Sequence, residues 1–262
     1  MSDKAPLHIF HISRDDGTSL FLHPFLNRER VMERMESHPL EGRYGREPRV
    51  EAITGFRNEL YRLIEEEVRN WIGESRFIPR FLISAGVFLV VYVGLSLAVR
   101  DPLPVVDEIA LALGAALAAF LLRRRRDMQS DAALSKRMKL RSKVDGIVFS
   151  ESELVKRLEN VLHEEERASA ESIADRLSRD DEPVVNAGGE AEAEEVLSYL
   201  RVRFASREHR RQEKRLLAAE RGSLRDRDRE SLQKWAANRK VDFPLFALYV
   251  RLKRDFAKRT TG

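Results

Sequence analysis

Asp107 and Glu108 are two adjacent acidic residues directly before an apolar stretch that ends in arginines. Carboxylates at the end of a membrane helix have two chemical uses. They can accept hydrogen bonds from free N–H groups and interact favourably with the positive N-terminal end of the helix dipole. Alternatively, they can line a pore mouth and bind cations. A charge near the interface costs well below the roughly 2.5 to 3.5 kcal/mol of a mid-membrane charge. We therefore favour capping and packing, and a cation-binding ring stays open.

The other reactive residues predict no catalytic chemistry. The chain has no glycine-rich phosphate loop, no nucleophile elbow and no plausible triad. It has no cysteine, which excludes disulfides and thiolate metal sites and fits a reducing cytosol. We expect no enzyme activity, no catalytic, cofactor-binding or metal site, and we identify no small-molecule substrate. No carboxylate or thiolate is spaced to complete a metal site with the histidines His8, His11, His23 and His38.

The apolar segments that position the acids predict a transmembrane helical hairpin over residues 77–122. From Phe81 to Val99 there are 19 uncharged residues, about 28 Å of helix against a bilayer core of roughly 30 Å. From Ile109 to Leu122 there are only 14, and this segment reaches bilayer length only when extended back to residue 103. A single pass would leave it apolar in water, where it would aggregate. We predict passes at about 79–99 and 103–122.

Basic residues near the two passes predict their orientation. The segment between the passes has a single basic residue, Arg100, beside an expected outer turn at residues 101–104. Many basic residues flank the other ends: Arg69, Arg76 and Arg80 before the first pass, and the topology anchor Arg123, Arg124, Arg125 and Arg126 with Lys136 and Arg137 after the second. Both termini should therefore be cytoplasmic. No signal peptide, lipidation motif or eukaryotic targeting signal is recognisable, and arginine is abundant, which favours a bacterial inner membrane.

A helical wheel of the second pass separates small from bulky residues. Ile109, Leu113, Leu117 and Phe120 form an arc nearly opposite the two acids, so we expect the acids to face protein and the bulky arc to face lipid. Small residues at four-residue spacing let membrane helices approach closely. The predicted packing residues are Gly86, Gly94 and Ala98 on the first pass and Ala110, Gly114 and Ala118 on the second.

This layout resembles that of the mitochondrial calcium uniporter pore subunits. That family also has two passes, both termini on one side, flanking helices and acids that open the second pass. The resemblance implies a homo-oligomeric cation channel. In the family a tryptophan precedes an Asp-x-x-Glu-Pro motif, which places both carboxylates on one helix face. Here the acids are adjacent, about 100° apart, and Pro104 precedes them. The resemblance covers topology and about 25 residues and rests on layout alone.

Residues 1–76 are predicted to form an N-terminal cytoplasmic region. Residues 7–23 have the pattern of a short β-hairpin around the turn Asp16-Gly17. Gly42 and Gly45 mark a loop. From about Pro48 an amphipathic helix is expected, because Ile53, Phe56, Leu60, Ile64, Val68 and Trp71 recur at three- and four-residue steps.

Residues 123–262 are predicted to form a C-terminal cytoplasmic helical region. Ser150 and Glu153 have the spacing of a capping box before a helix. A linker is expected at about 180–189, where the sequence DDEPVVNAGG is typical of a flexible connection. One long helix should follow and end near Gly222. The fold class is therefore mainly α: a two-pass hairpin with cytoplasmic amphipathic or coiled helices and a short N-terminal β-hairpin.

Charge is strongly divided within the C-terminal region. Residues 151–200 contain 15 acidic and 5 basic residues, whereas residues 201–262 contain 19 basic and 8 acidic residues. We expect these segments to pair within or between chains; anionic lipid is a second partner for the basic segment, and nucleic acid is not expected. The predicted function is a membrane-anchored scaffold or adaptor that binds itself or a protein partner. The alternative is a homo-oligomeric cation channel or transport accessory.

Overall fold

The computed structural model describes residues 5–27, 30–98, 105–177, 184–185, 189–218, 226–236 and 241–261, which are mainly helical with one small mixed sheet. Contacts divide the chain into two compact units. Unit 1 combines Met1–Phe56 with Gly146–Gly262, and unit 2 is Arg57–Asp145. The two outer parts of the chain thus belong to one compact unit. The boundaries expected along the sequence, at 76 and 122, stay a prediction.

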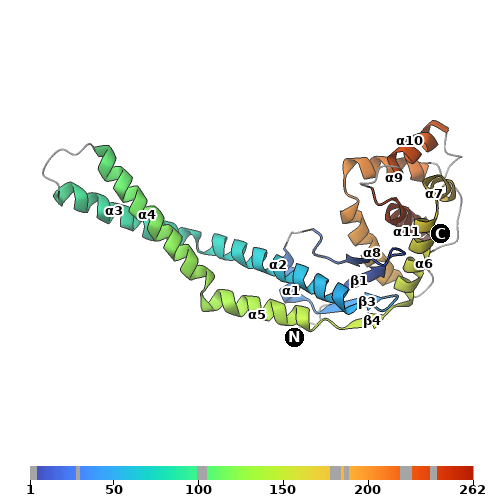
Figure 1. The fold of residues 1–262 in the computed structure, drawn as a ribbon, viewed down its shortest axis with the longest axis horizontal. Coiled ribbons are helices and arrows are strands. Elements are labelled where there is room, and N and C mark those ends of the chain that lie inside the picture. The colour runs from blue at the N-terminus through green and yellow to red at the C-terminus, as the bar shows by residue number, and fades with distance from the viewer. Residues whose placement is uncertain are drawn as a thin grey trace. The chain divides into compact units, whose positions relative to one another are not determined.

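The sheet of unit 1 has the strand order β2-β1-β3-β4 (Figure 1). Strands β1 (Leu7–Ser13) and β2 (Ser19–Leu22) form the expected antiparallel hairpin, and Gly17 in its turn has a φ of 78°, which suits glycine. Strands β3 (Leu40–Tyr44) and β4 (Phe149–Glu151) were not expected. β3 pairs in parallel with β1, and β4 pairs in parallel with β3.

Gly42 lies within β3, so the loop expected there is wrong. Gly42 pairs with Phe149 of β4, and a Cβ at Gly42 would lie 2.3 Å from the Phe149 ring. The absence of a side chain lets the aromatic ring cover the strand. Gly45 follows the strand in a bend, where a Cβ would lie 2.6 Å from the backbone of Lys156. Both glycines are therefore required by packing against distant segments.

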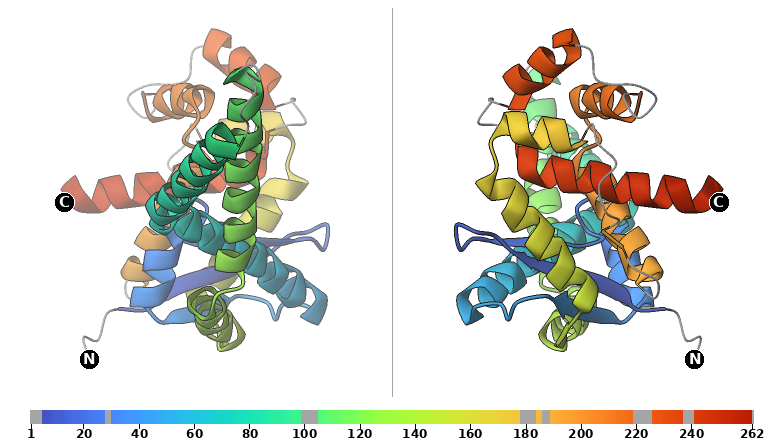
Figure 2. Two further views of the ribbon diagram at one scale, coloured as in Figure 1. Left: turned by 90° about the vertical axis from the view of Figure 1, so that its left-hand side faces the viewer. Right: turned by 90° about the vertical axis from the view of Figure 1, so that its right-hand side faces the viewer.

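Four helices of unit 1 pack around α11 (Phe243–Thr261), in which residues 245–250 are at most 2 % exposed. Figure 2 shows α11 crossing α6. The other helices of this unit are α1 (Val31–Ser37), α6 (Glu153–Arg167), α7 (Ala170–Leu177), α8 (Glu190–Arg203), α9 (Arg207–Ala218) and α10 (Asp226–Ala236). The apolar face of α11 is buried because α6, α7, α8 and α9 all pack against this helix.

The core of unit 1 includes two residues from the expected linker. Val184 and Val185 are buried in the same apolar cluster as α6, α8 and α11. Their backbone N–H groups donate to the carboxylate of Asp255, over 2.6 and 3.3 Å. This part of the predicted linker is therefore fixed to the core, because a buried backbone N–H needs a partner. Residues 180–183 and 186–188 lie outside the described residues.

Ser152, and not Ser150, caps α6. The Ser152 hydroxyl accepts a hydrogen bond from the N–H of Val155 over 3.4 Å. Ser150 pairs with Arg43 in the sheet. The capping box predicted at Ser150 is therefore wrong, because strand pairing holds Ser150 outside the helix.

The single helix expected from about residue 190 to 222 is interrupted. Helix α8 ends at Arg203, and α9 begins at Arg207. Phe204 in between is 4 % exposed and packs against the ring of Phe246, with centroids 5.3 Å apart. The Ser206 hydroxyl accepts from the N–H of His209 over 3.3 Å, which opens the new helix.

Unit 2 contains four long helical segments: α2 (Val50–Ser75), whose first residues belong to unit 1, α3 (Phe77–Ala98), α4 (Val105–Met128) and α5 (Asp131–Asp145). The amphipathic helix predicted from about Pro48 is confirmed as α2. Side chains of α5 bind α2, since Arg137 and Arg141 each lie 3.0 Å from the carboxylate of Glu65. Lys136 lies over the ring of Trp71, 4.5 Å from its centroid.

Candidate membrane anchor

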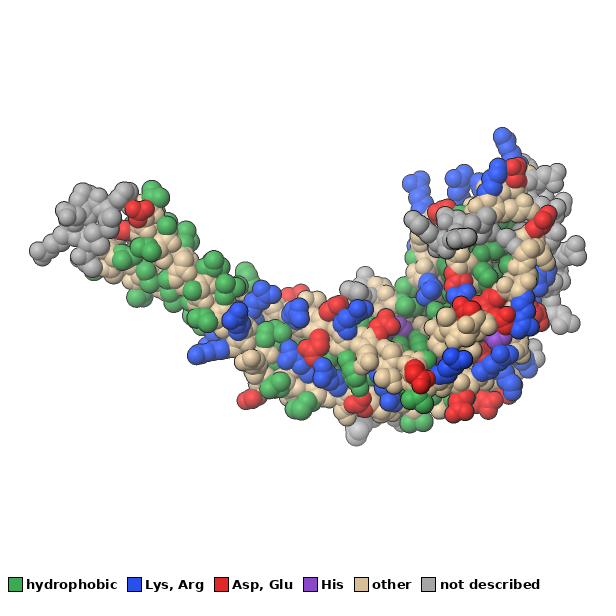
Figure 3. Space-filling view, viewed as in Figure 1, with side chains coloured by type: hydrophobic (Ala, Val, Ile, Leu, Met, Phe, Trp, Pro, Cys, Tyr) green, Lys and Arg blue, Asp and Glu red, His purple; other side chains and the backbone are tan. Residues whose placement is uncertain are grey.

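Helix α3 has the length and composition of a membrane span. The segment Phe77–Leu97 has a mean hydropathy of 2.0 over its most apolar window, of which 6 % is buried. Its 21 residues rise about 31 Å, which matches a hydrocarbon core of roughly 30 Å. Figure 3 shows hydrophobic side chains along α3 and α4. The large apolar side chains exposed on α3 are Phe77, Ile78, Phe81, Leu82, Ile83, Leu89, Val90, Val93 and Leu97.

Among the described residues, α3 is the one helix that is long and apolar enough to span a membrane. Helix α4 packs beside α3 but includes Arg123, Arg124, Arg125 and Arg126 in its last turns. Its apolar part is correspondingly shorter. The predicted outer turn at residues 101–104 lies outside the described residues. The second pass stays a prediction.

Alanines form the contact between α3 and α4. Ala112 and Ala116 are 0 % and 8 % exposed. The hydroxyl of Ser84 donates to the carbonyl of Ala116 over 2.6 Å. On α4 the bulky residues Leu113 and Leu117 are 56 % and 60 % exposed, as the helical wheel predicts. The small side chains bring the two helices close, and Leu113 and Leu117 point outward. Phe120 of the predicted arc is instead half-buried and contacts the ring of Phe77 on α3, with centroids 6.5 Å apart.

Most of the small residues predicted to pack the two helices together lie outside the contact between α3 and α4. Gly86, Gly94 and Gly114 have no neighbouring atom within 4 Å of the place where a Cβ would stand, and Ala110 and Ala118 are exposed. The contact between α3 and α4 therefore does not use these residues. The side chain of Ala98 lies outside the described ones.

The two acids of the first turn of α4 have different surroundings. Glu108 accepts a hydrogen bond from the Ser96 hydroxyl of α3, over 2.8 Å. Asp107 is exposed. Because adjacent residues on a helix point about 100° apart, one acid faces the neighbouring helix and the other faces outward. The sequence did not single out Ser96, although its polar side chain in an apolar segment was a usable signal.

At the other end of the hairpin, Arg80 and Asp127 form a buried ion pair. The Nε atom of Arg80 lies 2.6 Å from Asp127, and its Nη2 atom donates to the carbonyl of Ile72 over 2.8 Å. The two side chains are 4 % and 13 % exposed. Sequence reasoning treated Arg80 only as a topology charge and missed Asp127, the single acid directly after the four arginines. The pair joins the start of α3 to the end of α4.

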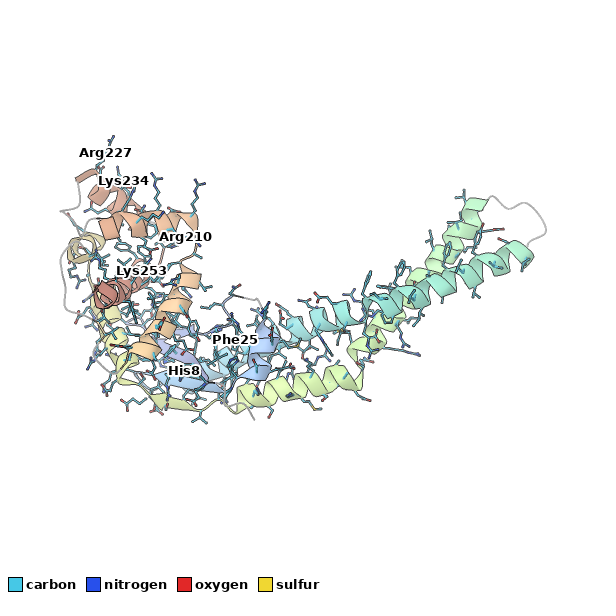
Figure 4. The ribbon with its side chains drawn as sticks, turned by 180° about the vertical axis from the view of Figure 1, so that it is seen from behind. His8, Phe25, Arg210, Arg227, Lys234 and Lys253 are labelled. Carbon is cyan, nitrogen blue, oxygen red and sulfur yellow. The ribbon has the colours of Figure 1, made fainter. Side chains whose placement is uncertain are left out.

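Unit 1 holds a hydrogen-bonded group around His8, beside α8 (Figure 4). The Nδ1 atom of His8 lies 2.6 Å from Glu195, which also accepts from the Tyr199 hydroxyl. The bond to Glu195 raises the pKa of His8, although burial opposes it. Burial favours a higher pKa for Glu195, but the bonds from His8 and Tyr199 outweigh burial and lower this pKa. The ion pair between His8 and Glu195 connects β1 to α8.

The other histidines considered as metal ligands, His11, His23 and His38, have separate surroundings. Burial lowers the pKa of His11 to about 4 and that of His23 to about 4, so both rings are neutral near pH 7. His38 lies next to α1, within hydrogen-bond distance of Ser37. Within the described ranges, no group of three or more His, Asp or Glu side chains is placed to hold a metal ion.

Comparison of the chain with protein-family models, with curated proteins and with solved structures gives no match.

Proposed function

We propose that the chain is a membrane-anchored helical adaptor without catalytic activity. In this proposal α3 and α4 cross a bacterial inner membrane twice, and both termini lie in the cytoplasm. Unit 1 then binds a protein partner or a second copy of the chain. The observation that carries the proposal is the apolar surface of α3, of which the most apolar window is only 6 % buried.

A bilayer explains this surface better than water does. Transfer of a Val, Leu, Ile or Phe side chain from water to an apolar environment is worth roughly 1.5 to 3 kcal/mol. The side chains of Leu82, Val90 and Leu97 are 63 %, 74 % and 79 % exposed. Soluble monomers rarely expose contiguous apolar patches beyond a few hundred Å².

Contacts at both ends of the hairpin support a second pass through α4. The bond between Ser96 and Glu108 lies at one end, and the buried pair of Arg80 and Asp127 lies at the other. Two helices joined in this way enter a bilayer as one unit. The exposed leucines of α4, among them Leu111 and Leu117, would then face lipid.

The charges of unit 1 support a role in binding rather than catalysis. The acidic helix α6 packs against the basic helix α11, and Glu165 lies 3.1 Å from Arg251. Part of the opposite charge of residues 151–200 and 201–262 is thus neutralised within the chain. The charged side chains that stay exposed form the surface we assign to partners.

The absence of native cysteine allows a direct topology test. Single cysteines are introduced by Ser37→Cys in unit 1, Asp101→Cys between the passes and Ser142→Cys on α5. Intact cells are treated with a membrane-impermeant maleimide, and permeabilised cells serve as the control for reactivity. Two passes with cytoplasmic termini predict labelling of the Asp101→Cys variant alone in intact cells.

Other labelling patterns contradict parts of the proposal. If Ser142→Cys is labelled together with Asp101→Cys, α3 is the only pass. If the protein is recovered in the soluble fraction after cell lysis, membrane anchoring is wrong. Labelling of Ser37→Cys in intact cells would reverse the predicted orientation.

A cation channel is the competing proposal, and the exposed position of Asp107 is what favours it. Glu108 already accepts a hydrogen bond from Ser96, so a cation-binding ring in an oligomer would consist mainly of the Asp107 carboxylates. Light scattering of the purified protein in detergent separates the two proposals. A monomer or dimer has too few helices to enclose a pore. A closed ring of four or more chains would favour the channel, and Asp107→Asn should then abolish cation flux.

A further inference from the structure

An open, strongly basic cavity lies on α9 of unit 1, outside the candidate membrane anchor. Its volume is about 990 Å³. Figure 3 shows Lys and Arg side chains gathered over α9 and α10. The described cationic side chains that line the cavity are Arg207, Arg210, Arg211, Lys214 and Arg215, and the other described lining residues are Ala205, Glu208, Gln212 and Ser231.

The core of unit 1 fixes the helix that carries these cations. Leu216 is 0 % exposed, and its carbonyl accepts from Arg254 of α11 over 3.2 Å. The ring of His209 contacts Trp235 of α10 and Phe204, with centroids 5.4 and 5.1 Å apart. The cationic side chains therefore project from a backbone that is already held in place.

Most cations of the cavity have no acidic partner among the described residues. Arg207, Arg210, Arg211 and Lys214 are exposed, and none lies within 4 Å of an acidic group in the part of the chain that the structure describes. Arg210 is labelled on α9 in Figure 4. Like charges four residues apart on a helix repel each other and destabilise the helix. This repulsion is relieved when an anion binds between the cations.

Arg215 shows how donors are oriented toward the cavity. Its Nη1 atom donates to the hydroxyl of Ser231 on α10 over 2.8 Å, and it lies 3.4 Å from Oε1 of Gln212. This bond links α9 to α10 across the cavity wall. It also orders the planar guanidinium, the group that binds phosphate oxygens in pairs.

We propose that this cavity binds a ligand that carries two or more phosphate groups. Among the described lining residues, five cations and one acid favour a multiply charged anion, and four of these five cations are guanidinium groups. The volume of about 990 Å³ is within the range of small-molecule sites, about 300 to 1,000 Å³. No aromatic side chain is among the described lining residues, so the stacking used by single-stranded nucleic acid binders is missing. A soluble polyphosphate compound and clustered phospholipid headgroups offer the same chemistry.

Calorimetric titration of the full chain in non-ionic detergent with tripolyphosphate tests the proposal. We expect saturable binding of one tripolyphosphate at about 0.15 M salt, where surface charges are largely screened beyond about 8 Å. Arg211→Gln and Lys214→Gln should each weaken binding about tenfold, because each substitution removes a charge-assisted hydrogen bond to a phosphate oxygen. Both side chains are exposed, so neither variant disturbs the core.

Arg157→Gln is the matched control, since Arg157 is an exposed arginine on α6 that does not line the cavity. It removes the same net charge and should change the affinity less than twofold. Equal weakening by all three variants would show a general charge effect and overturn the proposal. The absence of saturable binding, or tighter binding of a single-stranded oligonucleotide than of tripolyphosphate, would also overturn it.

Vesicles distinguish the two sources of phosphate. Vesicles with and without phosphatidylglycerol are added to the complex with tripolyphosphate. If the anionic vesicles displace tripolyphosphate from the wild-type chain, the cavity takes lipid headgroups. If neither vesicle displaces it, the cavity takes a soluble phosphate compound.

Discussion

The sharpest test of unit 1 is the removal of one buried charge. Glu165 of α6 is 0 % exposed. Its carboxylate lies 2.8 Å from Arg176 of α7 and 3.1 Å from Arg251 of α11. The substitution Glu165→Gln keeps the shape of the side chain but removes its charge. It therefore weakens the ion pairs that connect α6 to α7 and α11, without creating a cavity.

The structure sets the expected magnitude. Hydrogen bonds to charged groups contribute about 1.5 to 3 kcal/mol each, and breaking a buried ion pair costs about 3 to 5 kcal/mol. Arg176 is 30 % exposed and Arg251 is 14 % exposed, so water partly compensates the former. We expect Glu165→Gln to lower the free energy of unfolding by about 3 kcal/mol, a large share of the 5 to 15 kcal/mol typical of a domain.

Tryptophan fluorescence can report unit 1 alone. The chain has two tryptophans, and Trp71→Phe leaves Trp235, which is 6 % exposed in the core of unit 1. Urea unfolding of this background is compared with and without Glu165→Gln. Glu164→Gln is the control, because Glu164 is exposed next to the buried acid. A loss below about 0.5 kcal/mol, the usual range of surface substitutions, would refute the assigned role of Glu165.

Three further perturbations have expected outcomes. Gly45→Ala places a Cβ 2.6 Å from the backbone of α6 and should lower the stability of unit 1 by about 1 to 3 kcal/mol in urea unfolding. His8 has a pKa above its ordinary 6.5, and Glu195 has one below its ordinary 4.5. Their bond should therefore stabilise unit 1 most between pH 4.5 and 6.5, and the contribution is lost as pH rises through the pKa of His8 or falls through that of Glu195. Asp127→Asn leaves Arg80 buried without its charged partner and should lower the thermal stability of the hairpin in detergent by about 3 kcal/mol.

Each of these outcomes has a control. Gly73→Ala, on α2, meets no atom within 4 Å and should be neutral or stabilising; an equal loss at Gly45 and Gly73 would contradict the packing argument. His8→Asn should reduce the dependence of stability on pH above about 6.5 and below about 4.5, and an unchanged pH profile would exclude the bond as its cause. Asp131→Asn, at an exposed acid that follows Asp127 in the sequence, should leave hairpin stability unchanged.

Local patterns in the sequence were sufficient for elements whose partners are near in the chain. The hairpin of β1 and β2 joins strands separated by a short turn, and the register follows from the Asp16-Gly17 turn. The apolar length of α3 is a property of consecutive residues. The outward position of Leu113 and Leu117 follows from the helical period of α4. These features depend on composition and spacing within one segment.

The tertiary structure decided the features whose partners are far apart in the chain. β4 pairs with β3 across more than 100 residues, and this pairing turned Gly42 into a strand residue and left Ser152 to cap α6. The valines of the expected linker became core residues because Asp255 accepts their N–H groups. Parallel pairing and burial depend on the partner segment, and no local pattern records that partner.

The candidate sites show the same division. The sequence by itself determined that an apolar helix with basic flanks exists and that acids open the next helix. Only the tertiary structure separated Glu108, bonded to Ser96, from the exposed Asp107, and only it paired Arg80 with Asp127. The basic cavity of α9 likewise required the break after α8. Charge and hydropathy belong to the residues, whereas the energy of a charge depends on its burial and on the group that packing places beside it.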